Sequence, residues 1–322
     1  MRQAGRYLRE YRVIRAKASL LEICHRPELA SEVTLQPVER LGVDAAIIFA
    51  DILLPFEPLD LGLSFAAGEG PIISKPIRAA GHVARLPSFH PETDLEYVLE
   101  AIRLAVRALQ GRVPLIGFAG APFTLASYAI EGGSTRTFAE TKRLMYQDPD
   151  TWHALLDRLA GIVGHYLAAQ ARAGAEALQL FDSWVGCLSP EDYRRYVFPH
   201  SAKAIALAGE AGAPVIHFGT DTAGFLDVMA EAGGDVIGVD WRVPLDKAWE
   251  AFPDRGIQGN LDPCALFAPR GELKERVCDI MDRAAGRPGH IFNLGHGILP
   301  HTDPEQVRAV VEMVHDRTAA RV

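Results

Sequence analysis

The chain of 322 residues carries 41 acidic and 33 basic side chains, which gives a formal net charge of −8 at pH 7. This balance argues against general nucleic-acid binding, and the sequence has neither an apolar run near the ~20 residues of a membrane span nor the pattern of a signal peptide. Its four cysteines lie far apart and form no CxxC pair and no zinc-finger spacing, which predicts a reducing, cytoplasmic environment.

The first seventeen residues, MRQAGRYLREYRVIRAK, run against this acidic balance and contain a single acid, Glu10. Their basic side chains are Arg2, Arg6, Arg9, Arg12, Arg15 and Lys17. Guanidinium groups offer paired, planar donors that fit carboxylates and phosphates. A solvated helix face explains the spacing of Arg2, Arg6 and Arg9, and a ligand with many negative charges is the functional alternative.

Segments of helical pattern alternate with short apolar runs along the rest of the chain. A helix is predicted at 27–41, a strand at 44–51, and a long loop or hairpin at the Gly- and Pro-rich residues 55–76. Further helices are predicted at 94–110, 138–146 and 152–173, from Ser189 onward, and at 224–232, 245–251, 272–285 and 304–322. Further strands are predicted at 114–119, 176–181, 213–218, 235–241, 256–261 and 290–295.

This alternation of strands and helices predicts a parallel sheet with helices outside it. Seven strands over this length favour a (β/α)8 barrel, also called a TIM barrel, in which one strand escapes detection and a single domain spans 1–322. The competing fold is a doubly wound open sheet. That fold usually has a glycine-rich phosphate loop after its first strand, and no such loop follows Asp51.

In a barrel of this kind, chemistry takes place at the carboxyl ends of the strands. The residues predicted at those ends include Asp51, Tyr128, Phe181, Asp182, Ser183, His217, Asp240, Asn260, Asp262, Asn293 and His296. Four of them also have ordinary structural explanations. Asp51 and Ser183 could cap helices. Tyr128 could be a core aromatic, and His296 a buried, hydrogen-bonded histidine. A barrel would bring all four to one mouth, which favours a shared site.

Several blocks of sequence strongly resemble the uroporphyrinogen decarboxylase family. The blocks are RQAGRYL at 2–8, FADIL at 49–53, GFAGAPFTL at 117–125, YAIEGG at 128–133, LFDSWVG at 180–186, GNLDP at 259–263 and NLGHGI at 293–298. They occur in the family's order from Met1 almost to the C-terminus. RQAGRYL and GFAGAP together are the most specific of them.

The resemblance implies a (β/α)8 barrel, usually a homodimer, that uses no metal and no organic cofactor. It implies removal of CO2 from the four acetate side chains of uroporphyrinogen III to give coproporphyrinogen III in haem biosynthesis. Neither nucleic acid nor membrane is an expected partner. Carried over by position, the substrate-binding residues are Arg2, Gln3, Ala4, Gly5, Arg6, Arg15, Asp51, Tyr128, Ser183 and His296.

The sequence departs from the family pattern in two places. Family members usually begin well before the RQAGRYL motif, whereas this sequence begins inside it, so we expect a shortened N-terminal edge. Arg9 stands where the family typically has proline. That exchange either loosens the loop or adds one more surface cation.

The chemistry implied by the resemblance needs a group that stabilises positive charge near the pyrrole nitrogens. Protonation of a pyrrole carbon creates a cationic ring, which accepts the electrons released with CO2. A carboxylate that faces the pyrrole N–H groups offsets this charge, and Asp51 is the expected residue. Arg2, Tyr128 and His296 complete the predicted catalytic set. The proton donor stays open among Arg2, His296 and a bound water, because a guanidinium is a very weak acid.

Two other functions compete with this hypothesis. A zinc-dependent, corrinoid-linked methyltransferase of the same superfamily would need thiolate and imidazole ligands, but the residues after His217 are Phe218 and Gly219 where those relatives have His-x-Cys. A non-catalytic tetrapyrrole-binding barrel would keep Arg2 and Arg6 but would not need Asp51. The presence of all three favours catalysis.

Overall fold

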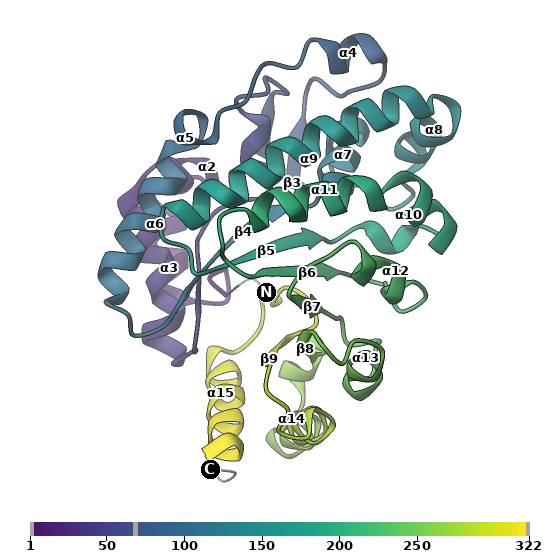
Figure 1. Cartoon of the computed structure of the whole chain (residues 1–322). Helices are drawn as coiled ribbons and strands as arrows, with labels where there is room; N and C mark the ends of the chain where they lie inside the picture. The colour runs from purple at the N-terminus through teal and green to yellow at the C-terminus, as the bar shows by residue number, and fades with distance from the viewer. Residues whose placement is uncertain (1–2, 67–69, 320–322) are drawn as a thin grey trace.

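The computed structural model describes residues 3–66 and 70–319, which form a curled parallel sheet surrounded by helices (Figure 1). Seven strands pair in the order β1-β4-β5-β6-β7-β8-β9, and every neighbouring pair is parallel. Their bounds are β1 (Ala46–Ile47), β4 (Leu115–Gly120), β5 (Ala177–Asp182), β6 (Val215–Gly219), β7 (Val236–Gly238), β8 (Gly256–Leu261) and β9 (His290–Leu294). All seven predicted strands are therefore confirmed.

The prediction of a complete eight-stranded barrel is confirmed only in part. Within residues 3–66 and 70–319, β1 and β9 are the two edges of the sheet, and no eighth strand joins them. The free edge of β1 is hydrogen-bonded by a side chain instead. Gln3 Nε2 donates to the carbonyl of Ala45 at 2.7 Å, and the amide of Ile47 donates to Gln3 Oε1 at 3.0 Å. The side-chain amide thus takes the place of a neighbouring strand.

The segment predicted as a long loop or hairpin contains a two-stranded antiparallel hairpin, β2 (Leu63–Ala66) and β3 (Gly70–Ile73). The α-helices are α1 (Arg9–Arg15), α2 (Leu20–Cys24), α3 (Pro27–Leu41), α4 (Ala80–Ala84), α5 (Pro91–Asp94), α6 (Glu96–Leu109), α7 (Pro122–Glu131), α8 (Ala139–Gln147), α9 (Pro149–Arg172), α10 (Pro190–Tyr196), α11 (Phe198–Gly209), α12 (Leu226–Glu231), α13 (Leu245–Ala251), α14 (Arg270–Ala284) and α15 (Pro304–Ala319). Short 3-10 helices are η1 (Leu54–Phe56), η2 (Val185–Cys187) and η3 (Pro263–Phe267). None of the helices in the described part of the chain is both long and apolar enough to span a membrane.

The N-terminal segment is not the continuous helix that its arginine spacing allows. Arg6 lies in a turn before α1, Arg9 is the first residue of that helix, and Arg2 falls outside the described residues. The interpretation that Arg6 and Arg9 share one helix face is therefore wrong. The first position of a helix accepts proline readily, so Arg9 occupies a site where proline would also fit, and its side chain is exposed.

The helices differ from the prediction at several places, since the short α2 and α4 were not predicted and two longer segments also differ. The segment from Ser189 divides into α10 and α11, because Pro199 has no N–H with which to continue α10.

Helix α7 was not predicted at all. Eight of its ten residues are buried, from Pro122 to Ile130, so it lacks the polar face that reveals most helices. Its remaining signals are Pro122 at the start and Gly132, with φ of +84°, just after the end.

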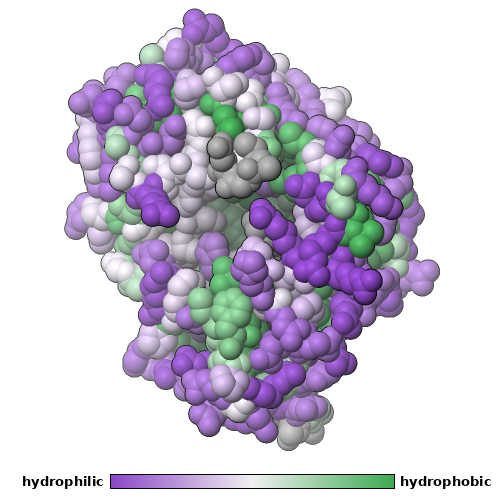
Figure 2. Space-filling view, turned by 180° about the vertical axis from the view of Figure 1, so that it is seen from behind, coloured by the Kyte–Doolittle hydropathy of each residue, from purple (hydrophilic) through white to green (hydrophobic). Residues whose placement is uncertain are grey.

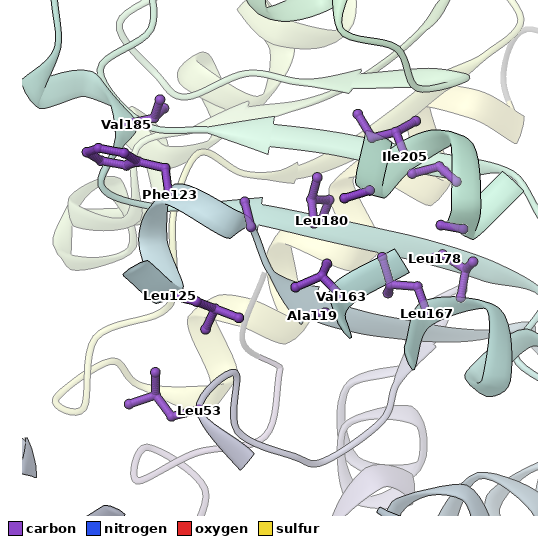
Figure 3. Close-up of a cluster of buried hydrophobic side chains, with 14 of the residues drawn as sticks. Leu53, Ala119, Phe123, Leu125, Val163, Leu167, Leu178, Leu180, Val185 and Ile205 are labelled. Carbon is purple, nitrogen blue, oxygen red and sulfur yellow. The ribbon is translucent and has the colours of Figure 1, made fainter. Parts of the chain in front are cut away.

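The hydrophobic core lies between the sheet and its helices. Figure 3 shows Leu178 and Leu180 of β5 beside Val163 and Leu167 of α9 and Ile205 of α11. Helices α9 and α11 approach closely because Gly164 has no side chain. A Cβ there would lie 2.5 Å from Leu207 Cβ and 2.9 Å from the carbonyl of Ala204.

Gly164→Ala should therefore destabilise the protein by about 1–3 kcal/mol, because the added methyl overpacks this helix interface. Gly161 in the same helix has nothing within 4 Å of its Cβ position, so Gly161→Ala should stabilise by about 0.5–1 kcal/mol. Urea unfolding of both variants measures the difference. Equal effects of the two substitutions would contradict a close contact at Gly164.

Candidate active site

A cavity of about 410 Å³ opens at the carboxyl ends of the strands and brings the predicted site residues together. Figure 2 shows a hollow in the middle of one face, with hydrophilic residues around its rim and hydrophobic atoms in its depth. The predicted residues on the cavity wall are Gln3, Ala4, Gly5, Arg6, Arg15, Asp51, Tyr128, Ser183 and His296. The remaining one, Arg2, lies outside the described residues.

The cationic part of the wall comes from the N-terminal segment. Tyr7 and Leu8 anchor this segment because both are buried in the core, and the Tyr7 hydroxyl donates to the carbonyl of Gln3. Arg6, directly before them, is exposed and lines the cavity. Arg15 of α1 also reaches the cavity, and its Nη1 donates to the carbonyl of Ala18 at 2.6 Å. The wall therefore presents guanidinium groups from a segment held firmly by its neighbours.

Asp51 lies on the same wall, in the loop that follows β1. Its Oδ1 accepts a hydrogen bond from the amide of Leu53 at 2.9 Å, just before η1. Asp51 is not the N-cap of η1, since that position is Leu53, and its local bond to the backbone does not compete with a role in the cavity. The bond holds the carboxylate in one orientation while the side chain remains on the cavity wall.

An aromatic floor, which we define as Phe118, Phe181 and Phe218, lines the depth of the cavity. These side chains come from the neighbouring strands β4, β5 and β6, with ring centroids 5.6 Å apart for the first pair and 5.9 Å for the second. Phe181 was predicted at a strand end but without a role, and Phe118 and Phe218 were not singled out, because the reading of the strand ends considered mainly polar side chains. The available signal was one phenylalanine near the end of each of three successive strands.

A model of the uroporphyrinogen decarboxylase (URO-D) family matches residues 1–317. The chain belongs to the uroporphyrinogen decarboxylase family. It is 56% identical over 317 residues to uroporphyrinogen decarboxylase of Carboxydothermus hydrogenoformans, covering 98% of this chain and 91% of that one. It is 55% identical to the enzyme named uroporphyrinogen decarboxylase from Sorangium cellulosum, over 98% of this chain and 90% of that one.

A more distant likeness concerns the fold alone. The solved structure of a methyltransferase from Methanosarcina mazei aligns with a TM-score of 0.76 at 19% identity, over 92% of this chain and 87% of that one. Among the described residues of this uroporphyrinogen decarboxylase family member, no three His, Cys, Asp or Glu side chains are grouped so that they could hold a metal ion.

The other predicted strand-end residues of this family member do not line the cavity: His217, Asp240, Asn260, Asp262 and Asn293. His217 is fully buried, and burial lowers its pKa to about 4, so its imidazole is neutral at pH 7. Asp240 is also buried, and it accepts hydrogen bonds from Arg242 Nη1 and from the amide of Asp221. His217 and Asp240 are therefore buried in the protein interior and do not contribute to the cavity wall.

Three residues that do not line the cavity lie behind its wall: Asp182, which was predicted at a strand end without a role, and Thr124 and Trp184, which were not singled out. Thr124 Oγ1 donates to Asp182 Oδ1 at 2.7 Å, and the amide of Trp184 donates to Thr124 Oγ1 at 3.3 Å. The Trp184 ring stacks on Tyr128, with centroids 3.8 Å apart. Asp182 is completely buried, and burial raises its pKa to about 7. Their signal in the sequence was a polar residue inside each of the GFAGAPFTL and LFDSWVG blocks.

The raised pKa of Asp182 predicts a dependence of stability on pH. A carboxyl group whose pKa is higher in the folded state stabilises the fold at low pH, and this contribution is lost as the pH rises through about 7. Between pH 5 and pH 8 the wild-type protein should lose about 3 kcal/mol relative to Asp182→Asn, which cannot titrate. Denaturant unfolding at several pH values measures the change.

Asp148→Asn is the matched control for this measurement. Asp148 caps α9 by accepting a bond from the amide of Thr151, and this bonding lowers its pKa. The group is therefore ionised throughout pH 5–8, and its substitution should shift stability equally across that range. A constant difference between wild type and Asp182→Asn would show that Asp182 does not bind its proton more tightly in the folded state.

Proposed function

We propose that the chain catalyses removal of CO2 from the four acetate side chains of uroporphyrinogen III, which gives coproporphyrinogen III in porphyrin and haem biosynthesis. The observation that carries this proposal is one cavity whose wall combines Asp51 with Arg6 and Arg15 above an aromatic floor. This cavity belongs to a chain that shares 56% identity with a protein named for that reaction. No metal or organic cofactor is part of the proposal.

The proposed substrate is a flexible ring of four pyrroles that bears eight carboxylates. Arg6 and Arg15 would bind carboxylates at its edge through charge-assisted hydrogen bonds, with Arg2, Gln3, Tyr128, Ser183 and His296 as further contacts. The backbone of Ala4 and Gly5 would complete this wall. The aromatic floor would receive the apolar faces of the pyrroles, because stacking and burial favour contact between rings.

Asp51 would stabilise the cationic intermediate. Protonation of the ring carbon next to the one that bears an acetate places positive charge on the pyrrole, and a carboxylate at the pyrrole N–H groups offsets it. The C–CO2 bond then breaks, and its electron pair neutralises the ring cation as CO2 leaves. The exocyclic methylene carbon then takes up a proton and becomes a methyl group, and the ring carbon gives back the proton added first, which restores the pyrrole, so that one proton is consumed for each CO2. The substrate supplies the electron sink, so the protein must supply only charge, position and a proton.

Asp51→Asn should lower kcat by about 10²- to 10³-fold, because the amide keeps the shape of the side chain but removes its charge. Asp262→Asn is the matched control. Asp262 also follows a strand, and its Oδ1 bonds the amide of Cys264 at 2.8 Å just as Asp51 bonds that of Leu53, but it lies off the cavity. Anaerobic turnover of uroporphyrinogen III with separation of the products measures both. Near-normal turnover by Asp51→Asn would refute the proposed mechanism.

The proton donor can be identified from the pH dependence of the rate. His296 and a bound water are easier donors than Arg2, because a guanidinium releases a proton only at very high pH. If His296 is the donor, His296→Asn should remove one ionisation from the profile of kcat against pH, while Arg2→Lys keeps it. The reverse pattern would exclude His296. A profile that is unchanged in both variants would leave the bound water as the donor.

The proposal also concerns the whole assembly. We propose that the curled seven-stranded sheet is that of a single-domain barrel of the (β/α)8 type, open between β1 and β9 over the described residues, and that the protein acts as a homodimer in the cytoplasm. In support, the edge of β1 is hydrogen-bonded by the Gln3 side chain, and the exposed or partly exposed residues of β9 contrast with the buried strands β6 and β8. Sedimentation equilibrium tests the dimer.

A further inference from the structure

We propose that Asp182, Thr124 and Trp184 form a positioning unit that fixes the Tyr128 ring on the cavity wall. None of these three residues lines the cavity. The inference rests on the proposed function for its kinetic part, because Tyr128 is assigned there to substrate contact. Its structural part, the hydrogen bond between Trp184 and Thr124, can be tested without any substrate.

The unit begins with a polar contact in the apolar layer between β5 and α7. Asp182 is the last residue of β5, and Thr124 lies in the first turn of α7. Both side chains are fully buried, and their oxygens are 2.7 Å apart. A bond between two buried polar groups is costly to break, because neither side chain has water to replace its partner. It therefore ties the start of α7 to the end of β5.

The Thr124 hydroxyl has a single proton, which determines the donor and acceptor roles in its two hydrogen bonds. The hydroxyl donates to Asp182, which leaves its lone pairs to accept the hydrogen bond from the Trp184 amide at 3.3 Å. Because Trp184 lies two residues after Asp182, the loop after β5 turns back on α7 and is pinned there. Valine has nearly the shape of threonine but could form neither bond.

Tyr128 lies four residues after Thr124 in α7, so both side chains point from similar sides of that helix. Its ring stacks on Trp184 at 3.8 Å and 28°, and Phe138 packs edge-on against Trp184 at 5.3 Å. The contacts thus form a closed loop from Thr124 through Trp184 and Tyr128 back along α7. Ser183, which lines the cavity, stands between Asp182 and Trp184 in sequence and is held by the same anchor.

Thr124→Val should lower kcat by about 10- to 100-fold, because a small displacement of a substrate-contacting ring is enough for such a loss. Thr124→Ser keeps the hydroxyl and should recover most of the activity. Thr141→Val is the matched control, since Thr141 is equally buried and donates to Glu131 at 2.9 Å outside the unit. It should lower stability and leave kcat unchanged. Equal loss in Thr124→Val and Thr124→Ser would overturn the proposal in favour of simple packing.

A double-mutant cycle tests whether the unit acts through Tyr128. Tyr128→Phe removes the hydroxyl and keeps the stacked ring. If Thr124 acts by placing Tyr128, the loss from Thr124→Val should be much smaller in the Tyr128→Phe background than in wild type. Fully additive losses would show that Thr124 acts elsewhere and would overturn the proposal.

Hydrogen exchange separates this inference from the proposed function. The chain has four tryptophans, so labelling tryptophan with 15N gives a small set of backbone amide signals. The Trp184 amide should be protected in wild type and in Thr124→Ser, and should exchange faster in Thr124→Val. If the Trp184 amide were equally protected in Thr124→Val, the proposed hydrogen bond between Trp184 and Thr124 would be refuted. Absence of turnover in wild type, with the protection pattern as expected, would refute the proposed function and leave the contact standing.

Discussion

The alternation of side chains along β5 is the constraint on which the cavity depends. Phe181 and Ser183 line the cavity, whereas Leu180 and Asp182 are buried against the helices. A slip of one residue would exchange the two sets, placing Asp182 in the cavity and an aromatic ring against α7. Pairing of β5 with β4 and β6 prevents this slip, and the same pairing sets the spacing of the aromatic floor.

The fold was predictable where the sequence contrasts apolar and polar residues. Each strand of the sheet is a short apolar run that ends at a glycine or a polar residue, so all seven could be placed, and helices with a polar face such as α3 and α13 match their predicted bounds. Helix α7 offers no such contrast, because it is buried nearly all round. Its absence from the prediction also hid the relation between Thr124 and Tyr128, which becomes visible only once both are known to share a helix.

Local pattern could not distinguish the strand-end aspartates from one another. Asp51 and Asp262 each follow a strand and each bond the amide two residues ahead, yet only the first lines the cavity. Asp182 also ends a strand, and its neighbours keep it dry, with a pKa raised to about 7. These differences arise from packing between distant elements. The choice of Asp51 therefore came from family motifs, which record such tertiary differences, and not from spacing or composition.

The acidic character of the chain and its proposed polyanionic substrate are compatible because electrostatic interactions are short-ranged in salt. At physiological ionic strength the Debye length is about 8 Å, so the net charge of −8 is largely screened from a ligand already at the cavity. Arg6 and Arg15 of the N-terminal segment line the cavity itself, and the buried Tyr7 and Leu8 anchor this segment there. Gln3 joins the same segment to the edge of β1, next to the loop that carries Asp51. The position of the cations relative to the acid thus depends on one short segment held at both its edges, which makes that segment as important to the site as the strands themselves.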